Sequence, residues 1–387
     1  MRKLIFAIAF LIVLGSCNSS SDLVSSETKA VQFQLIDSLV VESLFELYLV
    51  GKNEQTGQYL FKDKNVKEIL LTDAKGGILA QPKLKGVDPD QVAIPWEIGF
   101  AGNEIAVKEF SAESKVHFFD LSFKKLRVSD PIAGGLNTFE IAPTRNGVSF
   151  LKIDEKSLLI GSDPNAVNPE LMAKNQQNSG LYEKSTSGFI VDVNSGKVVK
   201  LNLYPDSWQP RREGKWVGPA YPFIAVGSKS KIIAVLPRIG DQLFFYQLVN
   251  NELVPKGETL INHPKRKRGL VFNPEDEPLL YPNFFDLKAG GNLFLIHFYT
   301  EVPRDLYLPM KAQGIDNAKN PEHVELLRRT RRSKYILSDD KGNQTPIEDL
   351  PIEGQIHYMD ANDVIYIKPE SKEEKDYNVF YRYRVKM

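Results

Sequence analysis

From residue 31 onward the chain alternates between short apolar runs and polar turns. The runs are rich in Val, Ile, Leu, Phe and Tyr, and the segments between them are rich in Gly, Asn, Asp and Lys. This alternation is typical of β-strands joined by tight turns, because β-branched and aromatic side chains favour strands and small polar residues favour turns. Helical periodicity is scarce, so the pattern predicts a mostly β protein.

The strands form a degenerate repeat with two kinds of hairpin. In one, a polar turn leads into an apolar strand, as where Gly102 and Asn103 precede residues 105–110. In the other, an apolar strand ends at a turn that is often acidic. Four strands end in this way, before Asp73, Asp120, Asp192 and Asp339. Two hairpins make a four-stranded antiparallel sheet, which is the blade of a β-propeller.

We therefore predict an all-β fold, a β-propeller of six blades with short helical insertions. Six blades in this chain would have about 60 residues each, more than the ~40–45 of compact propellers. Insertions at 163–183 and 303–333 account for much of the excess. A single sandwich has about 100 residues, whereas strands recur here without a linker over a much longer span. A pair of β-sandwich domains is the alternative, and an elongated β-solenoid is a third.

Two segments predict helices. The first spans 320–332, where Asn320 can cap the helix and Pro321 falls in its first turn. Four arginines lie at its end, where cations complement the helix dipole. The second candidate helix spans 168–177.

The N-terminus has the features of an export signal. Arg2 and Lys3 precede an apolar run over 4–14 that is too short to span a bilayer, as in the apolar region of a signal peptide. The run leads into Leu14-Gly15-Ser16-Cys17, which resembles the lipobox of bacterial lipoproteins. In that family the Cys is linked to diacylglycerol and the peptide is cut before it. An ordinary secretory signal with an incidental Cys is the alternative.

The resemblance divides the chain into three parts. Residues 1–16 are the lipoprotein signal peptide, residues 17–30 are the lipidated Cys17 with a flexible serine-rich tether, and residues 31–387 are the propeller-like domain. Position 18 is Asn rather than Asp, so the familiar inner-membrane retention signal of enterobacteria is absent. The implied location is the cell envelope, anchored by lipid at the outer membrane. The choice between its periplasmic and surface sides stays open.

The lipobox, the tether and the long irregular β repeats together resemble the propeller-like lipoproteins of Bacteroidota, many of which are domains of unknown function. The likeness covers the whole chain, but only the lipobox is a sharp motif. It assigns no functional residue other than Cys17.

Composition and charge exclude several classes of function. Lys plus Arg and Asp plus Glu both number 49, which argues against a nucleic-acid-binding protein because such proteins have a basic excess. The single Cys excludes a disulfide framework, a thiolate zinc site and an iron–sulfur cluster.

Motifs for catalysis are missing from the sequence. The five His residues have no zinc-binding spacing, and there is no nucleophile elbow or phosphate-binding loop. No cofactor is predicted. Calcium is the one alternative, because the turns at 339–343 and 360–363 offer oxygen ligands, although neither continues into an EF-hand loop.

Two kinds of surface segment are candidates for binding. Basic clusters could bind anions such as lipid headgroups, acidic glycans or an acidic partner, or could simply be solvated. A proline-rich stretch over 204–222 holds Trp and Tyr residues that could be exposed in loops or could pack on the core. The candidate residues are Trp208, Arg211, Arg212, Trp216, Tyr221, Lys265, Arg266, Lys267, Arg268, Arg328, Arg329, Arg331 and Arg332.

These features favour a membrane-anchored, non-catalytic binding module. Its expected partners are membrane lipid through acylated Cys17 and a protein or glycan bound by loops on one propeller face. The alternative is a propeller hydrolase or lyase with a channel site drawn from several blades, with or without calcium.

Overall fold

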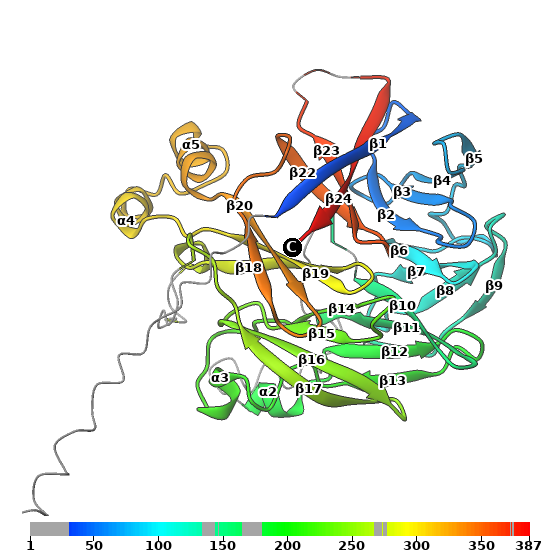
Figure 1. Ribbon diagram of the computed structural model, residues 1–387, viewed down its shortest axis with the longest axis horizontal. Coiled ribbons are helices and arrows are strands. Elements are labelled where there is room, and N and C mark those ends of the chain that lie inside the picture. The colour runs from blue at the N-terminus through cyan, green and yellow to red at the C-terminus, as the bar shows by residue number, and fades with distance from the viewer. Residues whose placement is uncertain are drawn as a thin grey trace, which may run out of the picture.

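The computed structural model describes residues 31–133, 144, 145, 147–164, 180–266, 273, 277–371, 373 and 375–387. In this part of the chain six four-stranded antiparallel sheets are arranged as a ring, each sheet contributing one blade (Figure 1). The prediction of an all-β propeller with six blades is therefore confirmed. Cys17 and its tether lie outside the described residues, as does the candidate helix at 168–177.

Each blade has an inner strand that contacts the inner strands of both neighbouring blades. These contacts form a closed ring around a central channel. The inner strands are β2 (Tyr48–Lys52), β6 (Pro95–Ala101), β10 (Val148–Ile153), β14 (Phe223–Val226), β18 (Asn283–Ala289) and β22 (Gly354–Met359).

The remaining strands follow outward from the channel in chain order, except in the last blade, where β1 is the outer strand. The second strands are β3 (Tyr59–Lys62), β7 (Glu104–Glu109), β11 (Lys156–Ser162), β15 (Ile233–Leu236), β19 (Leu293–Tyr299) and β23 (Val364–Pro369). The third strands are β4 (Ile69–Thr72), β8 (Val116–Phe119), β12 (Gly188–Asp192), β16 (Gln242–Val249), β20 (Ser333–Asp339) and β24 (Tyr377–Lys386). The outer strands are β5 (Ile78–Ala80), β9 (Lys125–Val128), β13 (Val198–Leu201), β17 (Glu252–Leu260), β21 (Gln344–Ile347) and β1 (Gln32–Glu42).

Middle strands are apolar on both faces because each sheet is packed between two others. Every residue of β8 and of β15 is buried. Strand β17 at a blade edge is mostly exposed, in contrast. The continuous apolar runs in the sequence are thus the middle strands of blades, which bury both faces.

The ring is closed by pairing the first strand of the domain with the last. β1 lies antiparallel to β24, in a register that runs from Gln32 opposite Lys386 to Glu42 opposite Tyr377. Leu39 and Val41 on β1 are buried, whereas Val40 between them is exposed. This alternation places the side chains of Leu39 and Val41 in the core of the last blade, whose other three strands come from the C-terminus.

The acidic turns cap themselves. Asp73 accepts hydrogen bonds at Oδ1 from the amides of Lys75 at 2.8 Å and Gly77 at 2.9 Å. Asp120, Asp192 and Asp339 bind amides of their own turns in the same way. These hydrogen bonds, first among them that from Lys75, lower the pKa of Asp73. The repeated Asp therefore marks the turn between the third and fourth strands.

All inner strands run in the same sense, so the connections separate onto two faces of the disc. Turns after the first and third strands lie on one face, which we call the short-turn face. Connections after the second and fourth strands lie on the other, the long-loop face. The predicted insertions join β11 to β12 and β19 to β20, so both belong to the long-loop face.

Four helices accompany these connections in the described part of the chain. The predicted cap is confirmed: α5 begins at Pro321, and the Asn320 side chain accepts from the amides of Glu322 and His323. None of the described helices is long and apolar enough to cross a bilayer. The helices are α2 (Gly180–Lys184), α3 (Gln209–Arg212), α4 (Arg304–Ala312) and α5 (Pro321–Thr330).

Closure of the ring by β1 predicts that substitutions at neighbouring positions of this strand change the free energy of unfolding by different amounts. Val41→Ala should lower the free energy of unfolding by about 2 kcal/mol, because it removes buried methyl groups where the ring closes. Val40→Ala, at an exposed position, should change it by less than about 0.5 kcal/mol. Urea unfolding followed by fluorescence measures both, and equal effects would contradict the closure described here.

Candidate functional site

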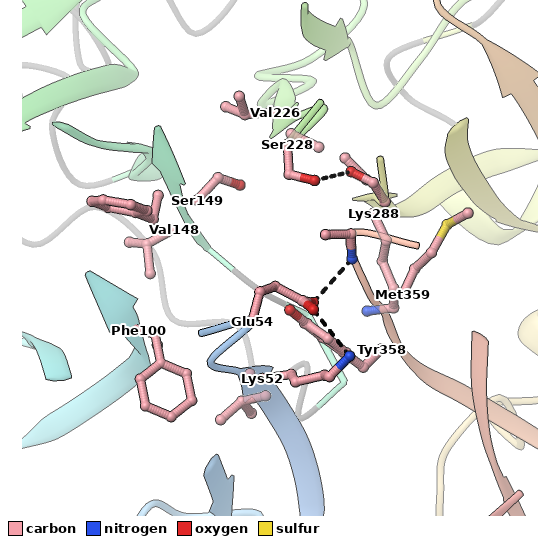
Figure 2. Close-up of a pocket in the computed structure, with 18 of the residues that line it drawn as sticks. Lys52, Glu54, Phe100, Val148, Ser149, Val226, Ser228, Lys288, Tyr358 and Met359 are labelled. Carbon is pink, nitrogen blue, oxygen red and sulfur yellow. Dashed lines mark hydrogen bonds and ion pairs between the residues drawn. The ribbon is translucent and has the colours of Figure 1, made fainter. Parts of the chain in front are cut away.

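A cavity of about 250 Å³ lies in the central channel, lined by all six inner strands and by the turns that follow five of them. It is at the short-turn end of the channel, since every inner strand except β10 contributes its later residues. Figure 2 shows side chains from different blades facing one another across it, among them Lys52, Ser149, Ser228 and Tyr358. A pocket shared by six blades can contact a small ligand from every side.

Glycines keep this end of the channel open. A Cβ at Gly51 would lie 3.1 Å from the ring of Phe100, and one at Gly290 would lie 2.5 Å from the carboxylate of Asp363. Side chains at these positions would have to displace neighbours on the adjoining blade. The small residues thus allow both close packing of blades and an empty centre.

Charged groups at the pocket join the first blade to the last. Lys52 Nζ lies 2.7 Å from Asp360. It also lies 3.0 Å from Glu54, which accepts from the amide of Ala361 at 3.1 Å (Figure 2). Burial alone would lower the pKa of Lys52, but the two carboxylates outweigh it and raise the pKa above its ordinary value. The Lys52 side chain is therefore charged at neutral pH, and the two carboxylates fix its position.

Hydroxyl groups complete the polar lining. Ser228 Oγ donates to the carbonyl of Gly290 at 3.1 Å. Burial, with a smaller contribution from the charge of Glu54, raises the pKa of Tyr358. The Tyr358 phenol is thus protonated at neutral pH and serves as a hydrogen-bonding group rather than a base.

A second charged cluster lies further along the channel, toward the long-loop face. Lys108 Nζ is 2.7 Å from Glu97 and 3.3 Å from Asp163, and Ser114 Oγ donates to Asp163 at 2.9 Å. Lys288 belongs to both regions: it lines the pocket and lies 2.6 Å from Asp286. Buried charges need such partners because an isolated one is costly to desolvate.

Lys62 is the exception in this cluster. It is 4% exposed, and its ammonium lies 3.5 Å from the carbonyl of Trp96, with no ion pair to a described carboxylate. Burial lowers the pKa of Lys62 to about 8, although the charge of Glu97 acts in the opposite direction. A large share of this side chain is therefore neutral only a little above physiological pH.

Two of the buried histidines stack on tyrosine rings. His297 stacks on Tyr335 with ring centroids 4.6 Å apart, and His357 stacks on Tyr48 at 5.1 Å. Burial lowers the pKa of His297 to about 3 and that of His357 well below its usual value, so both are neutral at pH 7.

Metal ligands do not gather in the described part of the chain, where no three His, Cys, Asp or Glu residues lie close enough to share an ion. The two turns considered for calcium use their oxygens internally. Asp339 accepts from Lys341, Asn343 and the Asn343 side chain, and Asp360 accepts from Lys52, Tyr366 and its own turn. Their donor partners favour the role of turn formation.

The aromatic candidates are less exposed than loop positions suggest. Trp208 is fully buried, its indole donating to the carbonyl of Ile239 at 3.1 Å, so it packs on the core instead of facing a ligand. Trp216 and Tyr221 are half-buried. Trp216 stacks on the buried Tyr182 with centroids 5.5 Å apart, which leaves its outer face accessible.

Two of the candidate arginines make contacts within the protein. Arg266 is buried, pairs with Asp241 and donates to the carbonyl of Gly240 at 2.5 Å. Arg331 lies over the ring of Tyr299, 4.5 Å from its centroid. Arg266 is therefore not a ligand contact in this conformation. Lys267 and Arg268 lie outside the described residues.

The remaining basic candidates are more accessible. Arg211 is half-buried and lies 2.6 Å from Asp206, and Arg328 is exposed and lies 2.7 Å from Glu325. The other exposed members of the set are Arg212, Lys265, Arg329 and Arg332.

All the described candidates belong to connections of the long-loop face. The turn 237–241 lies among them: Ile239 binds Trp208, Gly240 binds Arg266, and the charge of Arg238 contributes to lowering the pKa of Arg331, for which burial is the main cause. The structure thus brings together on one face segments that are far apart in the sequence.

Sequence reasoning missed the channel charges. Lys62, Lys108, Lys288 and Glu97 sit in or beside otherwise apolar strands. A charged residue within such a strand was the available signal, since the residue must face a polar channel or a partner.

Comparisons with known proteins agree with this architecture. A member of the DUF4221 family from Bacteroides vulgatus has a TM-score of 0.63 at 11% identity, over 93% of this chain and 99% of that one. A protein from Bacteroides fragilis described as exported has a TM-score of 0.51 at 10% identity, over 93% and 97%. At these identities the likeness shows the fold alone. The chain is a six-bladed propeller resembling these Bacteroides proteins.

A virginiamycin B lyase from Staphylococcus aureus, with a TM-score of 0.44 at 10% identity over 91% of this chain and 99% of that one, is too distant to carry an argument. No protein-family model and no curated protein matches the sequence.

Lys62 is buried without an ion pair to a described carboxylate, so the free energy of unfolding should depend on pH. The folded pKa of about 8 lies below the ordinary 10.5, so the unfolded chain binds more protons between these values and the free energy of unfolding rises with pH there. Lys62→Met should remove that rise and stabilise the protein at pH 7 by roughly 1–3 kcal/mol. Urea unfolding at pH 7 to 10 measures both effects.

Lys64→Met, at an exposed position in the turn that follows β3, is the matched control and should leave the pH profile unchanged. A destabilised Lys62→Met protein with an unaltered profile would show that the ammonium is well solvated in the folded state.

Proposed function

We propose that the protein is an exported lipoprotein, anchored at the outer membrane through acylated Cys17, and that its propeller is a non-catalytic binding module. The long-loop face would bind a protein or glycan. The lipobox ending at Cys17 supports the anchor, and the placement of the surface candidates supports the choice of face.

The observation that carries the proposal is the asymmetry of the disc. One face is built from tight turns, whereas the other holds the connections in which α2 to α5 lie, together with every described candidate. Loops on a rigid scaffold are where binding residues concentrate, because they can vary without disturbing the core.

Charge indicates the kind of partner. Exposed Arg212 and Lys265 come from the connections before and after the β14–β17 blade, and exposed Arg328, Arg329 and Arg332 come from the β19–β20 insertion. Arginine suits planar recognition of carboxylates, phosphates or sulfates. We therefore expect an acidic protein surface or an acidic glycan.

The binding role predicts partner capture that depends on this face. In-cell cross-linking of the full-length protein should give a recurrent partner linked through the long-loop face. Replacing Lys265, Arg328, Arg329 and Arg332 by Ser should reduce the yield at least tenfold, because several charge-assisted contacts are lost together. Mass spectrometry of the cross-linked products measures the yield.

Replacement of Lys75, Lys124, Lys197 and Lys341 by Ser removes the same charge from the short-turn face and is the matched control. Cys17→Ala should abolish membrane attachment and serves as the mislocalised control. Equal capture by the two quadruple variants would refute a role for the long-loop face.

Catalysis in the channel is the second candidate, favoured by the pocket and by Lys288, which connects it to the charged cluster containing Lys62. Ser149→Trp should discriminate the two functions, because an indole at this position would fill much of the cavity. Unchanged partner capture by this variant supports binding by loops. Loss of a hydrolytic or lyase activity found by substrate screening would instead support the channel.

A further inference from the structure

The chain enters the propeller on the short-turn face. β24 is the third strand of its blade and ends on that face, at Lys386. β1 is antiparallel to it and begins opposite Lys386, at Gln32, so β1 starts on the short-turn face and runs toward the long-loop face. Any anchor N-terminal to Gln32 is therefore tied to the short-turn side.

The length of chain before β1 limits how the domain can stand on a membrane. The sequence predicts a tether over residues 18–30, and a random-coil chain of that length, ~13 residues, has a root-mean-square reach on the order of 20 Å. β1 has 11 residues, which corresponds to about 36 Å of extended strand between the two sides of the disc. The tether is thus short compared with the strand that leads to the long-loop face.

The short-turn face carries lysines from five of the six blades. These side chains are all exposed and lie in or beside the turns: Lys75, Lys124, Lys156, Lys197, Lys229, Lys231 and Lys341. The exposed carboxylates in or beside the short turns are Glu54, Asp154, Glu155 and Glu252, and those of Asp340 and Asp363 are half-buried there.

The aspartates that begin four of these turns form no ion pair with the lysines that follow them. The Asp73, Asp120, Asp192 and Asp339 carboxylates are directed at their own turn amides. Lys75, Lys124, Lys197 and Lys341 follow them in the chain, and none of the four forms an ion pair with another described residue. Their ammonium groups are free to meet an external anionic surface.

We propose that the short-turn face rests on the anionic headgroups of the membrane that holds the lipid anchor, and that the long-loop face points away from it. Each lysine near an anionic surface strengthens binding roughly fivefold. The arginine clusters, which could also suit lipid headgroups, lie on the opposite face and remain available to a partner. The orientation rests on the proposed acylation of Cys17, whereas the affinity of the lysine face for anionic lipid does not.

The test uses the mature chain carrying Cys17→Ser, so that binding does not depend on acylation. The vesicles are made of phosphatidylcholine with about 30% phosphatidylglycerol, and pure phosphatidylcholine vesicles serve for comparison. Binding is measured by co-sedimentation at low salt. The protein should bind the anionic vesicles at least tenfold more tightly.

Two variants with equal charge change locate the contact. The first variant should weaken vesicle binding at least tenfold; in it Ser replaces Lys75, Lys124, Lys197 and Lys341. The second variant should change vesicle binding less than threefold, although it loses the same formal charge; in it Ser replaces Lys265, Arg328, Arg329 and Arg332. Equal losses, or no preference for anionic vesicles, would overturn the proposal.

Hydrogen exchange on the unmodified sequence provides an independent readout. Acylated protein reconstituted in the anionic vesicles should show slower exchange in the turns 73–77, 120–124, 192–197 and 339–343 than the unacylated chain in solution. Protection of the long-loop connections instead would reverse the orientation and overturn the proposal. Protection of the short turns by an acidic protein but not by vesicles would likewise overturn it.

Intact-mass analysis of the membrane-extracted protein reports acylation separately. An unmodified Cys17 would refute the proposed lipoprotein while leaving the vesicle result to decide whether the lysine face binds lipid.

Discussion

Pairing of β1 with β24 is the constraint on which the rest of the structure depends. Each blade is a sheet with two apolar faces, so each needs a neighbour on both sides, and only a closed ring supplies neighbours to all six. The last blade has three strands from the C-terminus and obtains its fourth from the start of the domain. Buried Leu39 and Val41 complete its core.

Closure also creates the central channel and gives it its chemical character. Backbone from six inner strands converges there, and the lining combines glycines with apolar side chains and a few polar groups. Two of the charged groups there are paired across blades, Lys52 with Asp360 and Lys108 with Asp163. These pairs fix neighbouring blades to one another, and Lys62, which lacks such a pair, is the group whose charge is least favoured.

The architecture could be predicted from the sequence because it depends on local signals. The acidic turns around Asp73 and Asp339 and the Asn320 cap are made by short-range hydrogen bonds, and the sequence contains both partners within a few residues. The channel residues could not be predicted in the same way, since Lys52 and Asp360 are brought together only by ring closure. Burial of Trp208 depends on Ile239 of the following blade, which is likewise a contact distant in sequence.

Closure by the N-terminal strand has a mechanical consequence. If the proposed lipid anchor and a partner on the long-loop face hold the molecule from opposite sides, tension enters the domain at Gln32 and passes along the length of β1. The hydrogen bonds to β24 lie across that direction, so the load is shared by the whole register from Gln32 to Glu42 and does not open one pair after another. The seam that completes the fold is therefore loaded in shear, the direction in which a strand pair resists separation best.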